Sequence, residues 1–170
     1  MAEVLIALGS NVGDRLGFLQ AAVAELAGFV CLKAASHVYS TDPMYVTDQP
    51  DFMNAAVLAD TTRSPRNLLC VLKSIEASIG RNITPRNGPR EIDLDLVAYG
   101  CLIYRYREAG VMKLEVPHPR TAERRFVLQP LADVAPNFVL PGIGSVASLL
   151  AQTQSQRESV KRIEDAFLPI

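Results

Sequence analysis

Two aspartates in the run Glu-Ile-Asp-Leu-Asp-Leu at residues 91–96 are the side chains best suited to chemistry. Alternation along a strand places Asp93 and Asp95 on one face, with their Cα atoms ~6.6 Å apart. Carboxylates this close repel each other unless cations lie between them, and Mg²⁺ binds carboxylate oxygens while keeping positions for phosphate and water. The pattern is short, so an exposed edge strand whose acids pair with Arg90 or Arg86 remains an alternative.

Basic residues lie on both sides of these aspartates. They are Arg81, Arg86 and Arg90 before them, and His118, Arg120, Arg124 and Arg125 after them. Arginine binds phosphate oxygens through two N–H groups at once, so acids flanked by arginines predict a site for a magnesium-bound nucleotide. The run at residues 9–15 lacks the Gly-Lys-Ser/Thr ending of a phosphate-binding loop, which leaves phosphate binding to side chains. The other histidine, His37, is predicted to be structural.

The composition excludes several classes of protein. The chain has 170 residues, of which 49% are hydrophobic and 21% charged, and no apolar run is long enough to cross a bilayer. A net charge of −1 argues against a general nucleic-acid binder, although residues 81–125 are locally basic. Cys31, Cys70 and Cys101 are widely spaced, and the N-terminus shows no secretory signal, so we expect reduced thiols in a cytoplasmic protein.

The spacing of apolar residues predicts an alternation of strands and helices that would position these side chains. Strands are expected at residues 4–8, 29–39, 52–59 and 92–99, and helices with Leu16, Leu19, Val23 and Leu26 and from Ser64-Pro65 to Gly80. The first helix would be capped by Asp14 or Asn11. This βαββαβ order predicts a ferredoxin-like α+β fold, an antiparallel sheet with helices packed on it.

The remaining segments complete one expected domain. Residues 41–51 and 81–90 are expected to be loops, and a short strand pair and a helix over 122–134 follow the last strand of the core. Residues 1–170 are predicted to form a single catalytic domain, with a core to about residue 140 and a C-terminal extension over 141–170. The polar stretch 152–165 is expected to form a peripheral helix or to fray.

Several separated motifs resemble the 6-hydroxymethyl-7,8-dihydropterin pyrophosphokinase family. They lie at residues 7–11, 39–43, 48–55, 88–95, 116–118 and 124–128, and the resemblance covers about residues 4–140. It implies transfer of the β,γ-pyrophosphoryl group of ATP to the hydroxymethyl oxygen of the pterin, a step of folate biosynthesis. By this resemblance Asp93 and Asp95 hold two Mg²⁺ ions, Asp95 orients the attacking hydroxyl or accepts its proton, and Arg81 and Arg90 form a catalytic pair.

The resemblance also implies two sets of binding residues. The pterin pocket maps to Thr41, Asp42, Met44, Phe52, Asn54 and Phe126. The ATP contacts map to Lys73, Glu76, Arg81, Arg86, Arg90, His118 and Arg124. The chain departs from the family pattern at Asn87, where tryptophan is frequent, at Lys73 and Pro119, and in a loop over 81–90 that is one residue shorter. These departures affect loop geometry and affinity rather than the reaction.

Two other functions are alternatives for this sequence. A Mg²⁺-dependent nucleotidyl- or glycosyltransferase would share the two aspartates but would not need a pocket of Phe52, Asn54 and Phe126. A nucleic-acid module on the same fold would need exposed strand aromatics and a basic sheet, which a chain with 6% aromatic residues and this charge does not offer. We therefore expect small-molecule substrates only, ATP and the pterin, with no nucleic acid or membrane partner, and a monomer.

Overall fold

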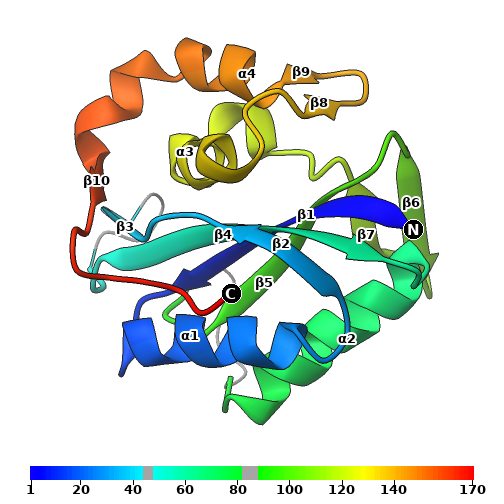
Figure 1. Ribbon diagram of the computed structural model, residues 1–170, viewed down its shortest axis with the longest axis horizontal. Helices are drawn as coiled ribbons and strands as arrows, with labels where there is room; N and C mark the ends of the chain where they lie inside the picture. Colours follow the sequence, from blue (N-terminus) through cyan, green and yellow to red (C-terminus); the bar gives the residue numbers. More distant parts are fainter. Residues whose placement is uncertain (44–47, 82–87) are drawn as a thin grey trace.

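A six-stranded antiparallel sheet forms the centre of the protein in the computed structural model, which describes residues 1–43, 48–81 and 88–170 (Figure 1). Its strands are β1 (Ala2–Ser10), β2 (Cys31–Ala35), β3 (Tyr39–Thr41), β4 (Phe52–Thr61), β5 (Asp93–Tyr99) and β10 (Val160–Arg162). Their order is β10-β3-β4-β1-β5, and β2 also pairs with β4. With α1 (Arg15–Leu26) and α2 (Pro65–Ser78), this arrangement confirms the predicted βαββαβ core.

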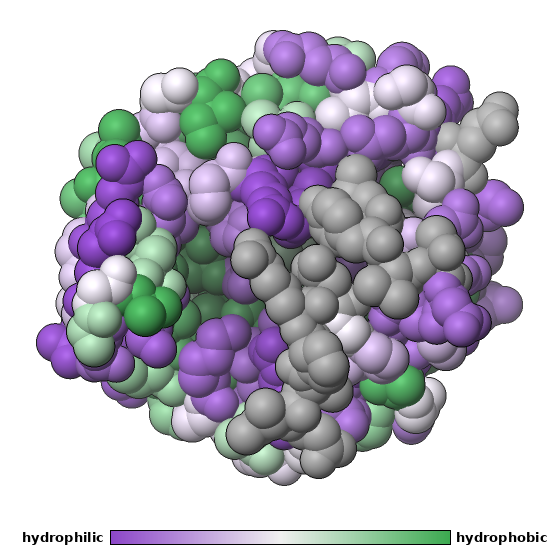
Figure 2. All heavy atoms as spheres, turned by 180° about the vertical axis from the view of Figure 1, so that it is seen from behind, coloured by the Kyte–Doolittle hydropathy of each residue, from purple (hydrophilic) through white to green (hydrophobic). Residues whose placement is uncertain are grey.

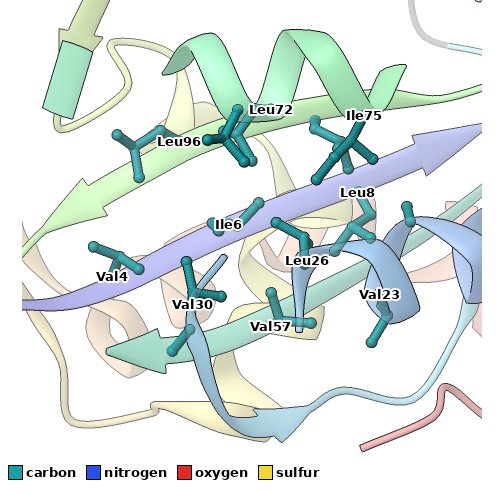
Figure 3. Packing of buried hydrophobic residues seen from close by; sticks show 14 of the residues in the cluster. Val4, Ile6, Leu8, Val23, Leu26, Val30, Val57, Leu72, Ile75 and Leu96 are labelled. Atoms are coloured by element: carbon teal, nitrogen blue, oxygen red, sulfur yellow. The ribbon is translucent and has the colours of Figure 1, made fainter. Parts of the chain in front are cut away.

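Side-chain caps mark the beginnings of the two core helices. The side chain of Asp14, not that of Asn11, caps α1 by accepting a hydrogen bond from Gly17 N at 3.1 Å. Ser64 caps α2 in the same way, and Pro65 occupies the first turn, where its missing N–H costs nothing. Both helices pack on one face of the sheet, where Figure 3 shows the aliphatic side chains between them, among them Ile6, Leu26, Leu72, Ile75 and Leu96.

A second hydrophobic cluster covers the opposite face of the sheet. Here α3 (Arg125–Val134) and α4 (Val146–Gln152), linked by β8 (Val139–Leu140) and β9 (Gly144–Ser145), lie over residues such as Leu5, Ala56 and Val97 (Figure 1). The helix expected over 122–134 is shorter in the structure, where α3 begins at Arg125. A 3₁₀ turn, η1 (Thr121–Glu123), precedes it, and Arg124 between them is extended, with φ −117° and ψ 98°.

Two further segments differ from the sequence expectation. The single strand expected over 29–39 is divided into β2 and β3. The strand is interrupted at Ser36, whose side-chain Oγ, rather than its backbone carbonyl, accepts the hydrogen bond from Ala56 N, at 2.8 Å. Residues 152–165 neither fray nor form a regular helix. They form a 3₁₀ helix, η2 (Gln154–Ser159), and then β10, which adds an edge strand to β3.

The remaining elements lie at the periphery of the core. The short strand pair is the hairpin of β6 (Tyr104–Glu108) and β7 (Val111–Val116), as predicted. The three cysteines are exposed and carry free thiols. In the described part of the chain, no helix has both the length and the apolar character needed to span a membrane.

Candidate active site

A cavity of about 120 Å³ opens on the face of the sheet that α3 covers, beside the first turn of α3. Its lining residues come from four strands, two loops and α3. They are Ala7, Leu8, Gly9, Thr41, Asp42, Gln49, Phe52, Asn54, Arg90, Asp93, Asp95, Arg124, Phe126 and Val127. Figure 2 shows a largely hydrophilic face of the molecule with a hollow whose floor is apolar.

Small residues on the central strand form the floor of this cavity. Gly9 is paired with Asn54 of β4 on one side and with Asp93 of β5 on the other, and Ala7 is paired with Asp95. A Cβ atom at Gly9 would lie 3.2 Å from Asn54 Oδ1, so glycine is what leaves room for that amide. The two small residues therefore open a space between the carboxylates and the asparagine.

Asp93 is held by two arginines. Its Oδ1 lies 2.8 Å from Arg81 Nη1, and its Oδ2 lies 2.5 Å from Arg90 Nη1. Burial alone would raise the pKa of the Asp93 carboxyl, but the charges of Arg90, Lys73 and Arg81 outweigh it and hold that pKa below its usual value. Asp93 therefore stays ionised, and the pairing that the edge-strand alternative proposed with Arg90 is present.

Asp95 has a contrasting environment two residues further along β5. Among the described residues none donates a hydrogen bond to its carboxylate. Burial and the negative charge of Asp93 raise the pKa of Asp95, against the opposing charges of His118 and Lys73. Burial also lowers the pKa of His118, and Arg124 adds to that effect. Two like groups on one strand are thus pushed in opposite directions, which is typical of functional sites.

The outer edge of β5 is supported from α2. The buried Glu76 accepts a hydrogen bond from Leu94 N at 2.7 Å, and its other oxygen pairs with Arg81. Lys73 Nζ lies 2.7 Å from Glu76 Oε1 and 3.3 Å from Leu94 O. Lys73 and Glu76 thus hold the strand between the two aspartates and position Arg81, without lining the cavity themselves.

Aromatic and amide groups form the opposite wall. Phe52 and Phe126 line the cavity, and the Arg124 guanidinium lies over the Phe126 ring, 5.5 Å from its centroid. Asn54 Nδ2 donates to Thr41 Oγ1 at 2.6 Å, which fixes the orientation of the amide. An apolar slot with a few fixed polar groups suits a flat heterocyclic ligand.

Asn11 connects the two loops around the site, a role that the sequence analysis missed. Its buried side chain donates to Gln49 Oε1 at 3.0 Å and to Pro50 O at 3.2 Å, and its Oδ1 accepts from Arg90 N at 2.8 Å. The position of Asn11 could have indicated this role. It directly follows a buried strand, and because Asp14 caps the helix, the Asn11 side chain can bind other backbone groups.

Most of the sequence-predicted residues meet at the cavity. Those that line it are Thr41, Asp42, Phe52, Asn54, Arg90, Asp93, Asp95, Arg124 and Phe126. Arg81, Lys73, Glu76 and His118 surround the aspartates without lining it, and Met44, Arg86 and Asn87 lie outside the described residues. Sequence reasoning missed the lining residues Ala7, Leu8, Gly9, Gln49 and Val127. Four of these are small or apolar and carry no chemical pattern, and Gln49 is a single amide in a loop. His37 is structural, and its Nδ1 lies 2.9 Å from Asp133 Oδ2.

Comparison with known proteins points to one family. The family model described as 7,8-dihydro-6-hydroxymethylpterin-pyrophosphokinase matches residues 5–136. A protein of Methylorubrum extorquens named 2-amino-4-hydroxy-6-hydroxymethyldihydropteridine pyrophosphokinase is 42% identical over 144 residues, which cover 84% of this chain and 88% of that protein. The mitochondrial folate synthesis bifunctional protein of Arabidopsis thaliana is 46% identical over 133 residues, but the match covers only 23% of its length.

Solved structures agree on the fold. A Plasmodium falciparum HPPK-DHPS structure matches with a TM-score of 0.72 and 16% identity, over 96% of this chain and 47% of that one. The chain thus spans about a quarter of the plant relative and about half of this larger structure. The family match and the Methylorubrum relative together show that this chain belongs to the 7,8-dihydro-6-hydroxymethylpterin-pyrophosphokinase family.

Proposed function

We propose that this protein transfers the β,γ-pyrophosphoryl group of Mg-ATP to the hydroxymethyl group of 6-hydroxymethyl-7,8-dihydropterin. The observation that carries the proposal is one cavity with Asp93 and Asp95 on one side and Phe52, Asn54 and Phe126 on the other. The hydroxymethyl oxygen attacks the β-phosphorus of ATP, the bond from that phosphorus to the α-phosphate oxygen breaks, and AMP leaves. The products are AMP and the dihydropterin diphosphate, an intermediate of folate biosynthesis.

The donor set fits two Mg²⁺ ions shared with ATP. Asp93 and Asp95 both face the cavity, and Asp95 is a half-buried carboxylate that accepts no hydrogen bond from the described residues. Within residues 1–43, 48–81 and 88–170, no group of three or more His, Cys, Asp or Glu side chains could hold a metal by itself. That set suits Mg²⁺, which binds through one or two carboxylates and takes its other ligands from phosphates and water. When bound, the ions neutralise charge on the phosphates.

The protein side chains have distinct roles in this proposal. Asp95 orients the hydroxyl and accepts its proton as the new bond to phosphorus forms. Arg81 and Arg90 stabilise the transferring phosphates. Of the predicted ATP contacts, His118 lies near Asp95, and Arg124 lies near His118. Phosphoryl transfer requires mainly in-line positioning and charge neutralisation, which this set provides. Lys73 and Glu76 act by holding Arg81 and β5 in place.

The pterin would lie in the slot between the aromatic side chains. Phe52 and Phe126 provide apolar faces, and Asn54, held by Thr41, offers an amide to the edge of the ring. Asp42 and Met44 complete the pterin set that the family resemblance implies. We also propose that residues 1–170 act as one catalytic unit and as a monomer, with Arg86 as a further ATP contact.

The proposed function is tested by following AMP formation from ATP. We expect AMP only when Mg²⁺ and 6-hydroxymethyl-7,8-dihydropterin are both present, because the hydroxymethyl group is the acceptor. Reactions without the pterin, and with EDTA, serve as controls. If purified protein forms no AMP with the complete mixture, or forms it equally without the pterin, the proposal is wrong.

Replacing Gly9 with alanine is expected to weaken pterin binding several-fold. The new Cβ would lie 3.2 Å from Asn54 Oδ1, so the amide must give by a few tenths of an ångström, which disturbs its hydrogen bond to Thr41. The backbone at Gly9 does not require glycine, so the free energy of unfolding should fall by only about 1 kcal/mol. The dissociation constant of the pterin, measured by its fluorescence, checks this. Unchanged affinity would show that Asn54 does not contact the pterin.

A further inference from the structure

The C-terminal segment lies beyond the family-matched residues 5–136, yet it contacts the turn that carries Arg124 and Phe126. After α4, the 3₁₀ helix η2 runs beside that turn, and β10 then pairs with β3, with Val160 opposite Thr41 (Figure 1). The segment therefore touches two parts of the proposed pterin slot from outside.

Gln156 of η2 bridges the two peptide groups on either side of Arg124. Its Oε1 accepts a hydrogen bond from Arg125 N at 3.1 Å, and its Nε2 donates to Glu123 O at 2.9 Å. Arg124 itself is extended and provides no side-chain cap for α3. Gln156 thus supplies the acceptor for an N-terminal N–H group that the helix leaves unpaired.

The side chain of Arg125 also joins the beginning of α3 to the C-terminal segment. Its guanidinium is buried and donates to Leu150 O at 3.1 Å, to Gln154 Oε1 at 3.2 Å and to Gln129 Oε1 at 3.0 Å. In the described part of the chain its partners are all uncharged oxygens, which the five N–H groups of arginine can satisfy together. This network fixes the beginning of α3 against residues 150–156.

Phe126 lies between the main cavity and this network. A second hollow is lined by Thr41, Asp42, Phe126, Gln156 and Val160, among others, and it shares the first three with the main cavity. Because the Arg124 guanidinium lies over the Phe126 ring, a shift of the Arg124 backbone moves both side chains.

We infer that Gln156 is a positioning residue that holds Arg124 and Phe126 in place, so that the C-terminal segment forms the outer wall of the pterin slot. This inference rests on the proposed function for the identity of the ligand. The bridge itself is a property of the ligand-free protein and is tested separately. Gln156 contacts no reacting atom in this assignment and acts through the two residues that line the cavity.

The first test measures amide hydrogen exchange by NMR in ligand-free protein. In Gln156→Leu the Arg125 amide loses its acceptor, so its exchange is expected to become about tenfold faster. The matched control is Gln152→Leu, the same change at an exposed residue at the end of α4 whose side chain makes no hydrogen bond within the described part of the chain. Unchanged exchange at Arg125 in Gln156→Leu would overturn the inference.

The second test measures the dissociation constant and the KM for the pterin. Both are expected to rise about tenfold in Gln156→Leu, while kcat stays within about threefold and Gln152→Leu behaves like wild type. Gln156→Glu retains the acceptor for Arg125 N but loses the donor to Glu123 O, so it should give a smaller rise. A lower melting temperature with unchanged pterin affinity in both Gln156 variants would overturn the positioning role. If wild type binds no pterin, the proposed function fails, and the exchange result still decides whether the bridge exists.

Discussion

Replacing Asp95 with asparagine is expected to lower turnover by about 10³-fold, with little effect on the fold. The carboxylate faces the cavity and accepts no hydrogen bond from the described residues, so its charge is available to Mg²⁺ and to the proton of the attacking hydroxyl. Loss of a metal ligand and of general-base catalysis accounts for a decrease of this size. The rate of AMP formation at saturating ATP, Mg²⁺ and pterin measures it.

Stability should change in the opposite direction to activity. Burial raises the pKa of Asp95 in the folded protein, so the ionised group costs stability at neutral pH and nothing below the unfolded pKa. The asparagine variant should therefore be more stable than wild type at pH 7 in EDTA, and the difference should vanish as the pH falls below about 4. Asp60→Asn, on β4 and paired with Lys33, is the control and should keep normal turnover. A large loss of stability with normal activity would contradict the proposed site.

The strand that carries the aspartates could be predicted from sequence because its period is local. Leu94 and Leu96 face the α1 and α2 core, and the aspartates face the other side, as the alternation requires. The second hydrophobic cluster could not be predicted in the same way. Residues such as Leu5 and Ala56 become buried only when α3 and α4 pack over the opposite face of the sheet.

Some site residues depend on long-range contacts that no local pattern contains. The predicted contacts of Lys73 and Glu76 with ATP stay predictions, and their contacts with β5 are of this long-range kind: Glu76 is buried at the edge of β5, because α2 packs beside that strand. Asn11 meets Arg90 across 79 positions, and Gln156 meets Glu123 across 33. The polar composition of residues 152–165 also hid β10, whose three residues form an edge strand in which exposed side chains are common.

Replacing Arg90 with methionine is expected to lower kcat by about 10³-fold and to leave the affinity for the pterin unchanged. Methionine keeps the unbranched apolar stem but removes the guanidinium, and an arginine that stabilises transferring phosphate charge contributes on the order of 10³–10⁵ to the rate. In the ligand-free protein this guanidinium binds Asp93, 2.5 Å away. It must therefore exchange this carboxylate for phosphate when ATP and Mg²⁺ bind.

The same substitution has a separate signature in stability. The charge of Arg90 does most to offset burial and keep the pKa of Asp93 low, so the variant should lose about 2 kcal/mol at pH 7. A lowered pKa contributes stability above the unfolded pKa and none once the pH falls through the folded value, so the deficit should disappear in acid. Arg63→Met, at a half-buried arginine that lies over the Phe29 ring, is the control and should keep full activity. If Arg90→Met shows the stability deficit but normal kcat, Arg90 serves only to balance the charge of Asp93. If it shows the kinetic loss with unchanged pterin affinity, Arg90 acts on the phosphates.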